Sequence, residues 1–325
     1  MTAPLLGALG LMLSLIVPKA LAQAHWPARV PAAAVVLWQC VTLASVLCAV
    51  GVVLAAPEET LRALGSGRVV AAWVLLGTLA VAAAIVSRLL LSLLEVTRRS
   101  RVRRDRHRLL VDLLDRAEYH GELDRSLDPG APRIDPGTLR ILDGALPFAY
   151  CLPGRSPRVV LSGGTLKVLA PEQVNAVLTH EQAHLRSRHD LVMESFSALY
   201  RALPAPLRRR TALDAVHLLL EMLADDAARR RSGAGPLREA LTTLGGAADA
   251  LIADTGLAAD AEADAAGRDS EAERRDRLER LRPGAPGFSV PLQLSAYALA
   301  VSVLVLPTVV LVVPWLAQAL PTWPL

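Results

Sequence analysis

Cysteine is scarce in this chain of 325 residues, which contains 3 Cys and no Cys-x-x-Cys pair. The scarcity excludes a disulfide framework and a structural zinc site built from thiolates. Cys40, Cys48 and Cys151 are therefore interpreted as small apolar residues that fill space.

Charge is absent from long parts of the chain. Charged residues make up only 20% and hydrophobic residues 53%, and the mean hydropathy is +0.37. This composition is too apolar for an ordinary soluble enzyme of this length. Residues 30–57, 69–87 and 283–325 carry no charged side chain, and crossing a bilayer takes about 20 residues. They predict membrane helices over 31–55, over 69–94 and within 283–325, where 292–313 is the best span.

The first apolar segment, 4–17, has two interpretations. The small residues Ala20-Leu21-Ala22 that follow it are typical of a cleaved signal peptide. However, Lys19 follows the segment and no basic residue precedes it, which is the charge order of an anchor whose N-terminus lies outside. We therefore expect a retained helix and four membrane spans.

Arginine predicts the orientation of these spans. Seven Arg lie in 98–108, directly after the third span, and five lie in 274–282, directly before the fourth. By the positive-inside rule, 98–282 is cytoplasmic and both termini lie outside the cell membrane. A basic run can also bind nucleic acid, but next to a span attraction to lipid headgroups is the simpler account. We expect the bilayer as a partner and no direct contact with nucleic acid.

The motif that carries chemistry is His180-Glu181-Gln182-Ala183-His184. On a helix, residues four apart share one face, so both imidazoles can reach one metal ion. Glu181 lies beside that face, where its carboxylate can deprotonate a water that the metal activates. The spacing predicts a catalytic Zn²⁺ site.

The surroundings of the motif predict a strand followed by a helix. Arg158 to Leu161 is typical of a short strand, and Ser162-Gly163-Gly164 of a turn that closes it. Pro171 suits the first position of a helix that carries the motif. A strand next to such a helix is where an extended peptide could add by edge pairing.

Two residues compete for the third ligand position. Asp190 falls where the pattern HExxHxxGxxH places its third ligand, but Ser187 occupies the glycine position. Glu221 lies in an apolar run with Asp225 four residues later, so one carboxylate can bind zinc while the other orients a ligand imidazole. We favour Glu221 as the ligand and Asp225 as the orienting residue.

Other polar residues have less defined roles. His189 is interpreted as a solvated helix end, and Tyr200, His217 and Arg229 are candidates to stabilise an oxyanion. The composition of residues 244–270 predicts a weakly packed linker. The alternating charges of residues 271–281 predict a solvated helix.

Together these features predict a mainly α integral membrane protein with an inserted catalytic domain. Residues 1–97 form three transmembrane helices (4–17, 31–55 and 69–94). Residues 98–282 form a cytoplasmic α+β zincin domain between helices 3 and 4. Residues 283–325 form the fourth helix and a short tail.

This order of spans and motifs resembles the BlaR/MecR-type antirepressor metallopeptidases. The segment Pro153 to Ser162 is similar to that family's strand and turn before the zinc helix. The resemblance implies that His180, His184 and Glu221 bind zinc, that Glu181 is the base, and that Asp225 matches the Asp of the family's ExxxD motif. Antibiotic-sensing members carry an extracellular penicillin-binding domain after the fourth span, whereas this sequence ends at Leu325. We therefore do not carry the sensing function over.

The sequence thus predicts a membrane zinc metalloendopeptidase that cleaves a cytoplasmic protein or peptide. Regulated proteolysis of a transcriptional repressor in signal transduction is the favoured task. The alternatives are a quality-control protease with many substrates and a non-catalytic receptor or scaffold in which zinc only adds rigidity. A homo-oligomer stays open as well.

Overall fold

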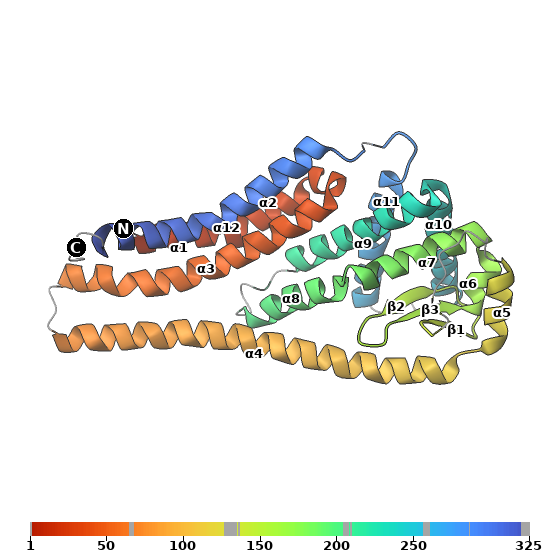
Figure 1. Cartoon of the computed structure of the whole chain (residues 1–325), viewed down its shortest axis with the longest axis horizontal. Helices are drawn as coiled ribbons and strands as arrows, with labels where there is room; N and C mark the ends of the chain where they lie inside the picture. The colour runs from red at the N-terminus through yellow and green to blue at the C-terminus, as the bar shows by residue number, and fades with distance from the viewer. Residues whose placement is uncertain are drawn as a thin grey trace. The chain divides into compact units, whose positions relative to one another are not determined.

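The chain divides into two compact units in a computed structural model, which describes residues 2–64, 68–126, 135, 137–203, 208, 210–255, 261–285 and 287–319 (Figure 1). The first unit comprises Met1–Val96, Ser195–Leu219 and Phe288–Leu325, and the second comprises Thr97–Glu194 and Leu220–Gly287. Residues 195–219 thus group with the apolar helices, although they lie inside the predicted 98–282 domain.

The first unit is built from long apolar helices. They are α1 (Thr2–Leu11), a π-helical turn η1 (Met12–Ile16), α2 (Val17–Gln23), a 3₁₀ turn η2 (Trp26–Arg29), α3 (Pro31–Leu64), the first part of α4 (Arg68–Leu114), and α12 (Val290–Ala319). Helices α1, α3 and α12 lie side by side (Figure 1). The packing is close, because a Cβ on Gly10 would lie 3.0 Å from Cys48 Cβ.

Four segments, which all begin in this unit, are long and apolar enough to cross a bilayer: Thr2–Gln23, Pro31–Ala55, Ala72–Leu114 and Val290–Val310. They overlap the four predicted spans and are compatible with a membrane protein. Their outer faces expose large apolar side chains, such as Trp73 at 69% and Val301 at 60%, as lipid-facing residues would. Helix α4 continues well past the predicted end at 94, because no Gly or Pro follows Gly77 within it.

The second unit contains a three-stranded sheet of β1 (Leu139–Leu142), β2 (Ala149–Leu152) and β3 (Arg158–Ser162), in the order β1-β3-β2. Strand β3 pairs parallel with β1 and antiparallel with β2. The predicted strand from Arg158 is confirmed, but the expectation that a peptide could pair with it is wrong. It is the central strand, so both its edges are already used, and β2 is the edge strand that packs on the motif helix.

The predicted turn at Ser162-Gly163-Gly164 is also wrong. Ser162 caps a short helix α6 (Gly163–Val168), its Oγ accepting a hydrogen bond from the Thr165 N–H at 3.1 Å. A Cβ on Gly164 would overlap the Ala145 carbonyl oxygen. This glycine therefore permits a close approach of two backbone segments.

Helix α7 (Pro171–Arg186) carries the motif and is packed on two sides. It begins at Pro171 as predicted, and the Ala170 N–H donates to Gln173 Oε1 at 3.1 Å. One face packs on the sheet and the opposite face on α9 (Thr211–Ser232) and α10 (Ala234–Thr255). The contacts on the sheet side are Val174, Val177 and Leu178 with Ile141, Val159 and Leu161, and on the other side Ala176 with Ala228 and Leu237. Each fully buried Val or Leu side chain contributes roughly 1.5–3 kcal/mol, so the position of α7 is well determined.

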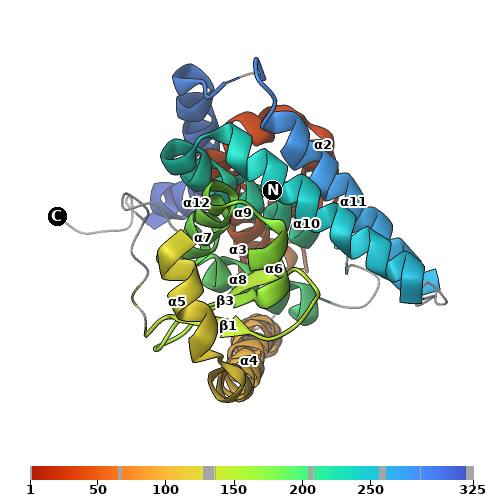
Figure 2. The same ribbon diagram turned by 90° about the vertical axis from the view of Figure 1, so that its right-hand side faces the viewer.

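The described part of residues 244–270 is helical, which the sequence does not predict. Within the interval 244–270, predicted as a linker, α10 continues to Thr255 and α11 (Ala261–Arg280) begins at Ala261. The two helices lie side by side (Figure 2). The predicted helix within 271–281 is confirmed, but it is solvated on one side only: Arg275 and Asp276 are exposed, whereas Leu281 is 2% exposed and the Arg277 side chain 13%. Carboxylates on α9 hold Arg277 in place.

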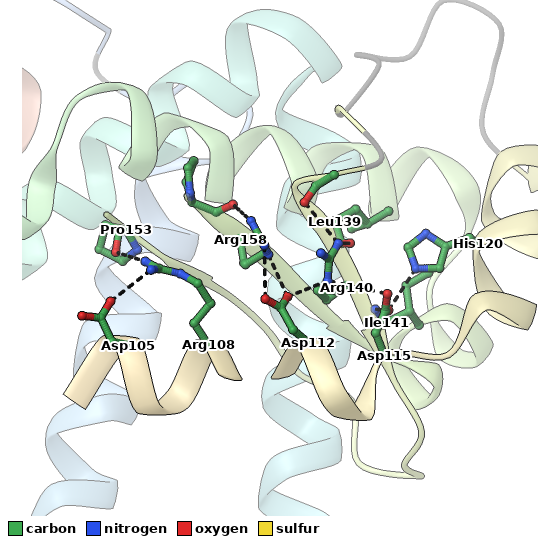
Figure 3. Close-up of polar contacts among 12 residues, drawn as sticks. Asp105, Arg108, Asp112, Asp115, His120, Leu139, Arg140, Ile141, Pro153 and Arg158 are labelled. Carbon is green, nitrogen blue, oxygen red and sulfur yellow. Dashed lines mark hydrogen bonds and ion pairs between the residues drawn. The ribbon is translucent and has the colours of Figure 1, made fainter. Parts of the chain in front are cut away.

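Ion pairs fasten the end of α4 to the sheet within the second unit (Figure 3). Asp112 Oδ1 accepts hydrogen bonds from Arg140 Nε of β1 and Arg158 Nε of β3, both at 2.8 Å. Arg108 donates to the Pro153 carbonyl at 3.3 Å. The hydrogen bond from Arg158, ahead of the bond and charge of Arg140, holds the pKa of Asp112 below its ordinary value.

Candidate active site

Helices α7 and α9 bring together the two motif histidines and Glu221. His180 Nε2 lies 3.2 Å from His184 Nε2. Glu221 Oε2 lies 3.3 Å from His180 Nε2, and its Oε1 lies 3.2 Å from His184 Nε2. Each residue offers one possible ligand atom, and these three atoms lie within 4.8 Å of one another.

This donor set fits a zinc ion. Zinc binds imidazole nitrogen and carboxylate oxygen at about 2.0–2.2 Å, so two ligand atoms of a tetrahedral site lie about 3.3 Å apart. The two imidazole nitrogens are 3.2 Å apart, and each carboxylate oxygen of Glu221 lies 3.2 to 3.3 Å from one of them, which is compatible with that geometry. Three protein ligands with a fourth position open are typical of a catalytic site, because structural sites usually have four.

Asp225 contacts the opposite nitrogen of His180. Its Oδ1 lies 3.0 Å from His180 Nδ1, and the Asp225 side chain is 1% exposed. A carboxylate on Nδ1 directs the lone pair of Nε2 toward the metal position and fixes the ring. Asp225 lies one helical turn after Glu221 on α9, so the same helix places both carboxylates on either side of His180.

Arg277 of α11 joins these two carboxylates. Its Nη1 lies 2.9 Å from Glu221 Oε2, and its Nε and Nη2 donate to Asp225 at 2.8 and 2.7 Å. Burial lowers the pKa of Arg277, but the hydrogen bond and charge of Asp225 outweigh burial and raise it. Arg277 therefore stays charged and balances part of the buried negative charge.

The carboxylates favour positive charge at the centre of the site. Burial lowers the pKa of His180, yet hydrogen bonds to Asp225 and Glu221 outweigh it and raise the pKa to about 10. Burial raises the pKa of Glu221, but hydrogen bonds from His180 and His184 hold it well below its ordinary value. A metal cation between these residues meets the same electrostatic preference.

The Glu181 side chain interacts with Cys151 of strand β2. Burial raises the pKa of this carboxyl, and a hydrogen bond from Cys151 of β2 partly opposes the rise. Burial, followed by the charge of Glu181, also raises the pKa of the Cys151 thiol, so the thiol stays protonated and donates. The sequence predicts that Cys151 only fills space, whereas in the structure its thiol also interacts with Glu181.

His189 is buried, and its prediction as a solvated helix end is wrong. It is the first residue of α8 (His189–Ala202) and is 6% exposed. Its Nδ1 lies 2.8 Å from His184 Nδ1. Burial lowers the pKa of His189 to about 4, so the ring is neutral and its lone pair can accept a hydrogen bond from His184.

The remaining candidates occupy other positions. Asp190 forms an ion pair with Arg104 at 3.0 Å, and Arg104 also bonds Glu194 at 2.7 Å. Arg229 lies 3.3 Å from Asp226 on its own helix. Tyr200 and His217 belong to the first unit.

A cleft lies beside the cluster in the second unit. It has a volume of about 280 Å³ and is bordered by the β2–β3 loop and by the corner between α7 and α8. Arg155, Leu185, Arg188 and Asp190 are among its lining residues. The cleft thus begins one residue after His184 and near the end of β2.

The family comparison agrees with this geometry. Residues 139–281 match the model of peptidase family M48. The M48 match covers the three strands and the helices from α6 to α11, and it supports a gluzincin-type metallopeptidase. Peptidases of family M48 are typically zinc-dependent. Comparisons with curated proteins and with solved structures give no match.

Sequence reasoning missed Arg277, His189 and Cys151. The sequence did contain a signal for Arg277. Three carboxylates within one apolar helix need cations nearby when they are buried. Arg277 and Arg280 are three residues apart, so one helix face can present both of them to those carboxylates. Arg280 indeed bonds Asp226. His189 and Cys151 depend on a helix corner and a strand pairing that the sequence does not specify.

Proposed function

We propose that this chain is a membrane-embedded zinc metalloendopeptidase. The convergence of His180, His184 and Glu221, with Glu181 beside them, carries the proposal. A purely structural site needs no general base and is usually closed by a fourth protein ligand. These features support a catalyst over a zinc-stabilised scaffold.

The residues divide the chemistry among them. His180, His184 and Glu221 would hold Zn²⁺, which supplies Lewis acidity for peptide carbonyls and water. Glu181 accepts a proton from the attacking water and later donates it to the leaving amine. Its raised pKa suits both steps, because the carboxylate is basic enough to take the proton. Asp225 and Arg277 hold His180 and Glu221 in position.

Strand β2 is the element that would hold an extended substrate. It lies at the edge of the sheet, packs against α7, and places Cys151 next to Glu181. A peptide that pairs with β2 would present its backbone to the base. The adjoining cleft at Leu185 and Arg188 would take a side chain of the substrate.

The favoured substrate is a cytoplasmic protein, in regulated proteolysis of a transcriptional repressor as in BlaR/MecR-type antirepressors. Four apolar helices and the Arg runs at 98–108 and 274–282 support a cell-membrane location with the peptidase in the cytoplasm and both termini outside. A broad set of cleaved membrane proteins would instead indicate quality control.

Metal content tests the site directly. Purified full-length protein is expected to bind one zinc per chain, and Glu181→Gln is expected to keep it while losing cleavage. Glu221→Gln is expected to lose zinc, and Asp190→Asn is the matched control that keeps it. Zinc retained by the Glu221 variant and lost by the Asp190 variant would overturn the ligand assignment.

Labelling of intact cells tests the topology. In a chain whose three native cysteines are replaced by Ser, Thr60→Cys is expected to react with a membrane-impermeant maleimide. Arg103→Cys is expected to react only after the membrane is opened. The reverse pattern would contradict the orientation.

A further inference from the structure

The first unit contains a second cavity, separate from the peptidase residues. Its volume is about 630 Å³, within the roughly 300–1,000 Å³ range of small-ligand sites. The turn η1 and helices α2, α3, α4, α8 and α9 all contribute to it. Most of its lining is apolar and includes Leu13, Val41, Ile85, Leu89 and Leu199.

Two cationic side chains, Lys19 and Arg88, line this mainly apolar cavity, and its lining contains no Asp or Glu. Arg88 Nε donates to the Ala202 carbonyl, at the end of α8, at 2.6 Å. Among the described residues, no acidic side chain forms an ion pair with Lys19 or Arg88. A cation within a membrane helix is costly unless a partner neutralises it, so the cavity favours an anionic ligand.

Trp38 supplies an independent observation. This residue of α3 lines the cavity and is fully buried at 0% exposure. Its indole Nε1–H has no hydrogen-bond acceptor among the described residues. A buried N–H without an acceptor costs about 1–3 kcal/mol, and a ligand that carries acceptor oxygens would remove that cost.

We propose that this cavity binds an anionic phospholipid. Its phosphate oxygens pair with Lys19 and Arg88, and its acyl chains lie against the apolar lining. Basic pockets between membrane helices are a known means of binding acidic headgroups. The proposal rests on the membrane location proposed above and is independent of peptide cleavage.

Quenching of tryptophan by brominated lipid acyl chains tests the proposal. Two full-length proteins would be reconstituted in bilayers, each with one Trp and the other four replaced by Phe. Trp73, 69% exposed on α4, reports contact with bulk lipid, whereas buried Trp38 reports a lipid seated in the cavity. Quenching is compared between brominated phosphatidylglycerol, which is anionic, and brominated phosphatidylcholine, which is not.

We expect both lipids to quench Trp73 equally and phosphatidylglycerol to quench Trp38 preferentially. Lys19→Gln and Arg88→Gln should each reduce that preference roughly fivefold. Arg88→Lys should keep it, and so should Arg103→Gln, an exposed charge of the basic run. Absence of Trp73 quenching would refute the membrane location itself. Quenching of Trp73 with equal or no quenching of Trp38, or loss of the preference only in Arg103→Gln, would overturn the lipid site alone.

Discussion

His184 Nδ1 lies 2.8 Å from His189 Nδ1, which links a metal-ligand candidate on α7 to the first residue of α8. His184 must offer the lone pair of Nε2 to bind metal, so its proton resides on Nδ1 and is donated to His189. The neutral ring of His189, whose pKa burial lowers to about 4, is a suitable acceptor. This contact fixes the ring of His184 as Asp225 fixes that of His180.

Loss of this contact should weaken zinc binding without removing a ligand. His189→Leu is expected to reduce zinc affinity about 10–100-fold, the usual effect of losing a residue that orients a metal ligand. His189→Asn retains an acceptor oxygen near the position of Nδ1 and should recover most of the affinity. Competition with a fluorescent chelator measures both, and equal losses in the two variants would show that His189 acts only through packing.

Arg277 should matter most when the metal is absent. Arg277→Met leaves the buried Asp225 and Glu221 without their cation, a change that costs about 3–5 kcal/mol. Zinc supplies positive charge to the same carboxylates, so it should restore part of the thermal stability. The control is Arg280→Met, which removes the ion pair with Asp226, a carboxylate that is not a metal-ligand candidate. An equal zinc-induced rise in Tm in both variants would contradict this role.

Cys151 should affect the pH dependence of cleavage. Its hydrogen bond lowers the pKa of Glu181 against the effect of burial. Cys151→Ala removes the bond, so the pKa of Glu181 rises and the acid limb of kcat/KM moves to higher pH, because the base must be deprotonated. Cys151→Ser keeps a donor and should keep the profile. The profiles are measured on a peptide from an identified cleavage site, and an unchanged limb in the alanine variant would refute the contact.

Asp112 should stabilise the second unit in a pH-dependent way. Its pKa is lower in the folded chain than its ordinary value of 3.8, so its contribution is complete above that value and is lost as the pH falls through the folded pKa. Asp112→Asn is expected to cost about 1 kcal/mol at pH 7, the upper range for partly exposed pairs, and less below pH ~4.

The matched control is Asp105→Asn on the same helix, where the carboxylate is 69% exposed and, among the residues that the structure describes, pairs with Arg108 alone. This change should stay within about 0.5 kcal/mol. Thermal unfolding of the full-length variants at pH 7 and at about pH 2.5, well below the ordinary pKa of Asp112, gives the comparison. A pH-independent loss in the Asp112 variant would show that the carboxylate acts by shape and not by charge.

Local patterns were enough to predict the helix from Pro171, the strand from Arg158 and the four apolar segments. Each depends on residues close together in the chain: a proline at a helix start, a run of β-branched residues, or about 20 residues without charge. The placement of His180 and His184 on one helix face, with Glu181 beside them, could be predicted from their spacing in the sequence. Their metal-binding and catalytic roles, and that of Glu221, stay predictions for the experiments above.

The errors arose where contacts between distant segments decide the structure. Gly164 was interpreted as a turn residue because its close approach to Ala145 is invisible in the sequence. His189 lies at a helix corner that turns its ring toward His184. Arg277 lies more than fifty residues from the carboxylates it pairs with, and a charged helix such as 271–281 is ordinarily solvated.

The most direct test of the central claim compares protein N-termini in cells that make the intact chain and in cells that make Glu181→Gln. The account predicts new N-termini only with the intact chain, in one cytoplasmic protein if the task is regulated proteolysis. N-termini in many membrane proteins would support quality control. Identical profiles from the two cell types under several envelope stresses, with zinc bound to both proteins, would contradict the assignment as a peptidase.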